Sequence, residues 1–208
     1  MMVMCSNHSS TVYISLCRQN PGRLGQIIGP KWYKAPRIEI PFALDNDAYA
    51  DFTNGKPFNY LAWVDMLNRV RGLGENPLWA AVPDVVANRE ATLANWKRFA
   101  PVARCYGWPL AFVVQDGMKP SDVPKDAAVV FVGGSTSWKW RTLPMWCEHF
   151  PRVHVGRVNN LEKVWICQRH GAESCDGSGW FRDSTEGGRA RQLRAWLHHG
   201  NDPQRMLL

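Results

Sequence analysis

Polar or glycine-rich segments directly follow six short apolar runs of the sequence. These segments begin at Asp45, Asp84, Gln115, Gly133, Gly156 and Asp176. In parallel α/β folds the carboxyl ends of the strands converge on one mouth, where active sites lie. We therefore expect the carboxylates of Asp45, Asp84 and Asp176 to share one pocket with the Gln115 amide and a glycine pair. Grouped carboxylates can supply a nucleophile and a proton carrier.

Each of these residues also has a simpler interpretation when it is taken alone. An aspartate after a strand commonly caps a helix or closes a turn. The pair Gly133–Gly134 is typical of a tight turn and also of a phosphate-binding loop. We expect Asp47, Asp51 and Asp116 to be solvated or to cap helices. The recurrence at six strand ends is what favours a shared site.

The elements that position these residues are predicted from apolar runs and helical spacing. The expected strands are Thr11–Ser15, Pro41–Leu44, Trp79–Pro83, Leu110–Val114, Ala128–Val132, Val153–Val155 and Ser174–Cys175. The expected helices are Tyr60–Val70, Arg89–Ala100, Leu143–Phe150, Leu161–His170 and Ala190–His199, with Asn88 as an N-cap and Gly200 as a C-cap. The strands are continuous apolar runs, which is typical of strands buried on both faces.

Alternating strands and helices predict an α/β fold with a parallel sheet. The 208 residues fit one domain, residues 1–208. Seven strand–helix units can be traced, which leaves two architectures open: a doubly wound sheet and a compact TIM-like (β/α)8 barrel. The barrel usually takes about 250 residues, so this one is expected to be trimmed or imperfect.

Composition narrows the class of protein. Hydrophobic residues make up 45% of the chain, too many for a disordered protein. The longest apolar runs are far shorter than the roughly 20 residues of a membrane span. With no leader-like start, we expect a soluble cytoplasmic protein without a membrane partner. The net charge of +7 is compatible with nucleic-acid binding, because phosphates attract cations.

The cysteines predict no metal centre. None of the six forms a C-x-x-C pair, and their spacing matches no zinc finger or ribbon. Cys167, His170 and Cys175 are a conceivable zinc set, but their spacing fits no known pattern, and free buried thiols are the default. Of the 11 tryptophans, most are expected to pack in the core, and one or two could stack on bases.

The ordered strand-end segments resemble a known family. They read FALDNDAY, VPD, VVQDG, VFVGGS, VHVGRVN and SCDGSG. This order is similar to the tRNA-guanine transglycosylase superfamily, and within it to the short DpdA-type DNA transglycosylases of phages and bacteria. The similarity covers Pro41–Gly179. It implies a TIM-like barrel that exchanges guanine in DNA for a 7-deazaguanine base such as 7-cyano-7-deazaguanine (preQ0), with no cofactor.

The resemblance also implies a role for each strand-end residue. Asp176 matches the nucleophile, and Asp45 matches the carboxylate that manages the proton of the departing and incoming bases. The remaining matches concern the bound base. Tyr49 stacks on it, Asp84 reads its N–H edge, Gln115 binds its carbonyl, and Gly133 and Gly134 lie against it.

The chain departs from the family in two respects. The tRNA enzymes carry a zinc site of three cysteines and a histidine that is not reproduced here, which weighs against docking of the tRNA type. The family's glycine after the Asp–Asn pair is Asp47 in this chain. Beside the DNA transglycosylase, three other functions stay open. They are a tRNA-type transglycosylase, a nucleoside hydrolase, and a barrel that binds nucleic acid without catalysis.

An enzyme that acts on DNA needs cations beside its active site, because they bind the negatively charged phosphates of the DNA backbone. The segment Leu16–Ile40 reads as one long basic loop after the first strand, and Arg157 follows another strand directly. We expect Arg157, Arg23, Lys31 and Lys34 to lie at the barrel mouth and bind DNA. A guanine must leave the base stack to be reached, which implies base flipping. The sequence names no protein partner; for a phage-encoded protein, the location would be the host cytoplasm.

Overall fold

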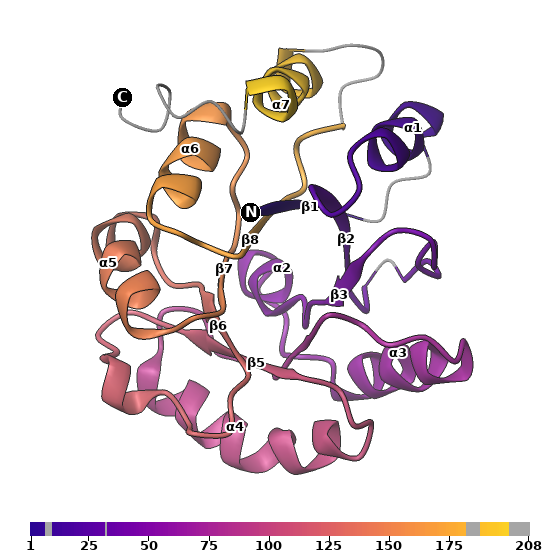
Figure 1. The fold of residues 1–208 in the computed structure, drawn as a ribbon. Helices are drawn as coiled ribbons and strands as arrows, with labels where there is room; N and C mark the ends of the chain where they lie inside the picture. The colour runs from indigo at the N-terminus through magenta and orange to yellow at the C-terminus, as the bar shows by residue number, and fades with distance from the viewer. Residues whose placement is uncertain (7–9, 32, 182–187, 200–208) are drawn as a thin grey trace.

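Eight parallel strands form a closed barrel in the computed structural model, which describes residues 1–6, 10–31, 33–181 and 188–199 (Figure 1). Each strand pairs with the next one along the chain, and β8 closes the ring against β1. The strands are β1 Met2–Ser6, β2 Leu24–Ile28, β3 Phe42–Leu44, β4 Ala80–Ala81, β5 Leu110–Val114, β6 Val129–Val132, β7 Val153–Val155 and β8 Ser174–Gly177. The TIM-like barrel is confirmed, and the doubly wound sheet is excluded because the sheet has no free edge.

Helices surround the barrel on its outer side (Figure 1). They are α1 Thr11–Gln19, α2 Ala48–Thr53, α3 Tyr60–Gly72, α4 Arg89–Arg104, α5 Thr136–His149, α6 Leu161–Arg169 and α7 Gly188–His199. A short 3-10 turn lies at Pro120–Asp122. α2 differs from the others because it projects over the centre of the ring (Figure 1). No helix in the described part of the chain is both long and apolar enough to span a membrane.

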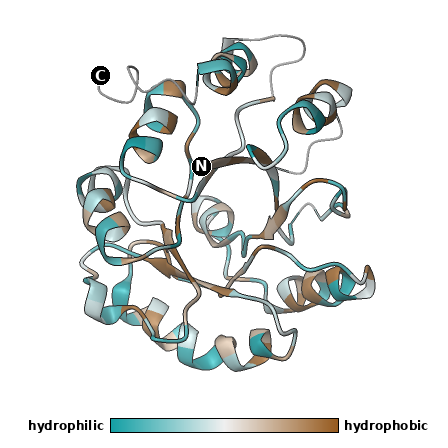
Figure 2. Ribbon diagram, viewed as in Figure 1, coloured by the Kyte–Doolittle hydropathy of each residue, from teal (hydrophilic) through white to brown (hydrophobic). Residues whose placement is uncertain are grey.

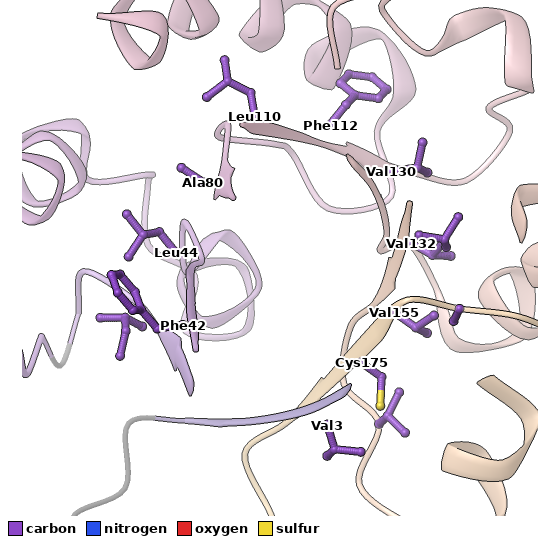
Figure 3. Close-up of a cluster of buried hydrophobic side chains, with 14 of the residues drawn as sticks. Val3, Phe42, Leu44, Ala80, Leu110, Phe112, Val130, Val132, Val155 and Cys175 are labelled. Atoms are coloured by element: carbon purple, nitrogen blue, oxygen red, sulfur yellow. The ribbon is translucent and has the colours of Figure 1, made fainter. Parts of the chain in front are cut away.

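Two apolar layers hold the barrel, one on each side of the strands. Side chains alternate along each strand, so Leu110 and Phe112 face the helices while Ala111 and Val113 face the barrel axis. Figure 3 shows the outer layer, and Figure 2 shows apolar strands with hydrophilic outer helix faces. The inner layer combines the large Trp79 and Phe131 with small alanines. Both faces are buried, which explains why the strands read as continuous apolar runs.

The N-terminal part of the chain differs from the sequence prediction. Thr11–Ser15 is not a strand but the start of α1, with Ser10 capping the helix and Tyr13, Ile14 and Cys17 facing the core at helical spacing. The first two strands are β1 and β2, which the sequence prediction missed. Together with the six predicted strands that are present, they complete the eight strands of the barrel.

The segment Leu16–Ile40 is therefore not one long loop, because it contains the end of α1 and the whole of β2. A buried polar residue of β2, Gln26, ties down the chain that follows. Its Nε2 donates to the carbonyls of Arg37 and Ile40 at 2.9 and 3.2 Å, and its Oε1 accepts from the Arg37 N–H at 3.0 Å. This connection runs from the mouth back to the opposite end of the barrel.

Among the remaining helices, α3, α6 and α7 are close to their predicted positions, and α2 was not predicted. Asn88 caps α4 as predicted, accepting from the Ala91 N–H at 3.0 Å. α4 runs four residues past its predicted end at Ala100, through Pro101, and α5 begins at Thr136, seven residues before its predicted start at Leu143. The predicted cap Gly200 lies outside the described residues.

Candidate active site

A pocket at the carboxyl ends of the strands brings the predicted site residues together. Its cavity volume is about 60 Å³, below the usual 300–1,000 Å³ of ligand sites, and the pocket is open at its mouth. Its lining includes every residue that we expected in catalysis or base binding: Asp45, Tyr49, Asp84, Gln115, Gly133, Gly134 and Asp176. Arg157 and Asn46 also line it. The convergence expected from the strand ends is therefore present.

Asp84 is buried and lies between two side-chain amides, each of which donates a hydrogen bond to its carboxylate. Its Oδ1 accepts from Asn46 Nδ2 at 2.8 Å, and its Oδ2 accepts from Gln115 Nε2 at 2.6 Å. Burial raises the pKa of Asp84 to about 6, although the hydrogen bond from Asn46 and the charge of Arg157 act in the opposite direction. Each carboxylate oxygen has two lone pairs, so both can still accept from a ligand. Asp84 is thus no helix cap.

Gln115 is fixed by the bonds that its carbonyl oxygen makes. Oε1 accepts from the N–H groups of Ala87 and Gly134, at 2.8 and 3.0 Å. This sets the amide orientation and directs Nε2 toward Asp84. An amide nitrogen carries two N–H donors, so one remains after the bond to Asp84. The pocket thereby presents an acceptor and a donor side by side.

The glycine pair is required by close packing beside this amide. A Cβ atom on Gly133 would lie 2.8 Å from Gln115 Nε2 and 2.9 Å from Val113 Cγ1. Gly134 has φ of +68°, and a Cβ there would lie 2.6 Å from the Trp138 ring. Larger residues would displace Gln115 or block the pocket wall. The pair is a tight turn that also forms one side of the site.

Asp45 faces a group of other carboxylates. Burial raises its pKa well above the usual range, and the charges of Asp47 and Asp176 add to the effect. A carboxyl group in this environment retains its proton more readily than a solvated one. Asp45 and Asp176 lie in one pocket, so the two groups could divide acid and nucleophile roles.

Asp47 is neither solvated nor a side-chain cap, which corrects our expectation. Its backbone is left-handed, with φ of +58°, at the residue before α2. This conformation favours glycine, the residue that the resemblance expects at this position. The carboxylate turns to the backbone N–H of Lys31, from which it accepts at 2.8 Å. Burial raises the pKa of Asp47.

The two other aspartates have structural roles. Asp51 pairs with the Lys31 ammonium at 3.4 Å. Asp116 accepts from the N–H of Ser135 at 2.7 Å and so caps the start of α5, as expected.

A buried histidine, which we did not predict from the sequence, is hydrogen-bonded to the Asp176 carboxylate from the interior of the barrel. His154 Nε2 lies 3.0 Å from Asp176 Oδ1, and His154 Nδ1 lies 2.8 Å from Ser174 Oγ. His154 is fully buried, whereas the Asp176 side chain is 17% exposed at the pocket. A signal was available in the sequence, because His154 is the polar residue in the otherwise apolar run Val153–Val155.

Tyr49 and Arg157 form the outer wall of the pocket. The Arg157 guanidinium carbon lies 4.1 Å from the centre of the Tyr49 ring, and an Arg157 N–H donates to the Gly134 carbonyl. Arg157 has a left-handed backbone, with φ of +61°, which is unusual outside glycine. The Tyr49 side of the pocket is thus covered by a cation. Arg157 lies at the mouth, as expected.

The predicted DNA-binding cations are divided between the two ends of the barrel. Lys31 follows β2 and lies at the mouth, where its ammonium pairs with Asp51. Lys34 is exposed in the connection after β2. The placement of Arg23 was wrong: it directly precedes β2 and stacks on Trp196 at 4.2 Å, at the opposite end from the mouth. The cause is the missed strand β2, which reverses the direction of the chain there.

No metal site is found among the described residues, where no cluster of three or more His, Cys, Asp or Glu could hold an ion. The conceivable zinc set is therefore not assembled. Cys167 and Cys175 are free thiols buried in the core. The hydrogen bond with Cys167, together with burial, raises the pKa of Cys175.

Comparisons with known proteins identify the fold and leave the activity open. No protein-family model and no curated protein matches the sequence. Among solved structures, the chain is similar to 3-hexulose-6-phosphate synthase, with a TM-score of 0.53 and 12% identity over 94% of this chain and 99% of that one. At this level of identity the similarity shows a shared TIM-barrel fold alone.

Proposed function

We propose that the protein is a DNA guanine transglycosylase, an enzyme that exchanges guanine in DNA for a 7-deazaguanine base. The observation that carries the proposal is the pairing of Asp84 with Gln115 at the base of a pocket that also contains Asp45 and Asp176. Guanine presents two donors, N1–H and the exocyclic amine, beside the O6 acceptor. Asp84 matches the donors and the second N–H of Gln115 matches O6. A 7-deazaguanine has the same edge, so one pocket serves both bases.

The first half of the reaction follows from the two remaining carboxylates. Asp176 attacks C1′ of the flipped deoxyguanosine, and the C1′–N9 bond breaks with its electron pair leaving on guanine. The departing base takes the proton that Asp45 carries. The raised pKa of Asp45 supports this role, because the group must be protonated at the start. The product is an ester between Asp176 and C1′, as in retaining glycosidases.

The second half reverses these steps with a different base. The incoming 7-deazaguanine gives its N9 proton to Asp45, and N9 forms a bond to C1′. The bond between C1′ and Asp176 breaks, which restores the Asp176 carboxylate. Protons and electron pairs balance within the site, so the exchange needs neither ATP nor a cofactor.

Trapping of the covalent intermediate tests the proposal. The wild-type protein is incubated with guanine-containing DNA and no incoming base, then denatured and examined by gel and intact mass. We expect an adduct that Asp176→Ala abolishes and Asp126→Asn retains, since Asp126 lies away from the pocket in an exposed ion pair with Arg104. Salt-sensitive DNA binding without an adduct would contradict the proposal and indicate a non-catalytic binding barrel.

A further inference from the structure

A histidine side chain is buried inside the barrel, where most of its neighbours are apolar. His154 has no exposed surface and lies between the rings of Trp79 and Phe131, with ring centroids 4.7 and 4.6 Å away. An imidazole costs free energy in such surroundings unless both nitrogens are hydrogen-bonded. Both are bonded here, to Ser174 and Asp176.

The strand register explains how these partners meet. His154 is directly opposite Ser174 in the pairing of β7 with β8. Asp176 lies two residues farther along β8, on the same face and nearer the mouth. The three side chains therefore form a line that runs from the barrel interior to the pocket. This line is the only hydrogen-bonded connection to the Asp176 carboxylate within the described part of the chain.

We propose that His154 is a positioning residue for the nucleophile, an inference that rests on the proposed function. The Ser174 hydroxyl donates to Nδ1 and so selects the tautomer with hydrogen on Nε2. Nε2–H then donates to Oδ1 of Asp176, which fixes the rotation of the carboxylate and leaves Oδ2 to attack C1′. The interaction resembles the orienting bond of a catalytic triad, with the carboxylate rather than a hydroxyl as nucleophile.

The bond acts in both halves of the exchange. When Oδ2 forms the ester, Oδ1 becomes its carbonyl oxygen and still accepts from Nε2–H. When the ester breaks, the same donor stabilises the carboxylate that leaves. The proton stays on His154 throughout, because Asp45 transfers the proton of the base.

Two substitutions at one position separate this role from packing. His154→Leu fills the apolar site but has no donor, whereas His154→Gln can place an amide N–H near the position of Nε2. We expect His154→Leu to slow adduct formation by about 10- to 100-fold, the usual worth of a hydrogen bond to a charged group, with unchanged DNA affinity. His154→Gln should recover most of the rate. Ser174→Ala should have a smaller effect. The variant no longer selects the tautomer with hydrogen on Nε2, but His154 is still present and can donate to Asp176.

The controls distinguish the possible failures. A wild-type adduct that Asp176→Ala abolishes, together with a normal rate for His154→Leu, overturns the positioning role alone. An inactive wild type overturns both this inference and the proposed function. If His154→Leu does not fold, ¹⁵N NMR of the histidine side chains in the wild type decides. We expect hydrogen on Nε2 of His154, and hydrogen on Nδ1 alone would overturn the proposal.

Discussion

Replacement of Asp84 with alanine should remove the preference for guanine over hypoxanthine. The two bases differ only in the exocyclic amine, which we expect Asp84 to accept. A hydrogen bond to a charged group contributes about 1.5–3 kcal/mol, or roughly 10- to 100-fold in affinity. The wild-type protein should therefore bind guanine tighter than hypoxanthine by this factor. In Asp84→Ala the two affinities should become nearly equal.

The substitution should also reduce stability by a predictable amount. Asn46 and Gln115 each lose one hydrogen-bonded partner, but Asn46 keeps its bond to the Val82 carbonyl at 3.0 Å, and Gln115 keeps its two backbone donors. We expect the free energy of unfolding to fall by about 1–3 kcal/mol. A TIM barrel with an otherwise intact core should tolerate this loss and remain folded for the binding assay.

Calorimetric titration of the two bases into both proteins is the direct assay, with thermal unfolding to check the fold. The comparison between bases within each protein cancels general damage to the pocket. A folded Asp84→Ala protein that still prefers guanine by the wild-type factor would refute the reasoning. Asp84 would then be a structural acceptor for Asn46 and Gln115.

Three further predictions follow from the site. Because the pKa of Asp84 is raised to about 6, its acceptor form is lost as pH falls through this value, so guanine affinity measured by titration should drop below pH 6 in the wild type and not in Asp84→Ala. Arg157→Gly should uncover the Tyr49 ring and relieve a left-handed backbone, so that free-base affinity rises while DNA affinity falls; unchanged values for both would exclude Arg157 from the site. Neutralising Lys31 should weaken DNA binding and flatten its salt dependence, whereas neutralising Arg23, at the opposite end, should alter neither in a filter-binding assay.

β5 could be predicted from the sequence, because both its faces are buried and Val, Leu and Phe dominate it. β7 also matches its predicted bounds, although it is only three residues long and its central residue is His154. β2 was missed because its apolar pattern is interrupted by Gly25, a residue that is depleted in strands, and by the polar Gln26. Only the tertiary structure accounts for them. A Cβ on Gly25 would lie 2.6 Å from Met2 Sδ, and Gln26 is satisfied by the chain 11–14 residues later.

The residues that line the pocket could be predicted from the sequence, but the hydrogen bonds between them could not. Strand ends of a parallel barrel must converge, so the pattern alone placed Asp45, Asp84 and Asp176 in one pocket. The bond from Gln115 to Asp84 joins residues 31 positions apart, and the bond from His154 to Asp176 depends on the register of β7 against β8. Such contacts are set by geometry that residue spacing does not encode. For the same reason, Arg23 could not be placed once β2 was missed.

Mass spectrometry of nucleosides from digested DNA tests the central claim most directly. DNA is isolated from cells that express the wild-type protein or Asp176→Ala and are supplied with 7-cyano-7-deazaguanine. The account predicts a 7-deazaguanine deoxynucleoside in DNA from the wild-type culture, with a matching loss of deoxyguanosine, and none from Asp176→Ala. Equal levels in both cultures, or no modified nucleoside in DNA from cells that contain folded wild-type protein, would contradict it.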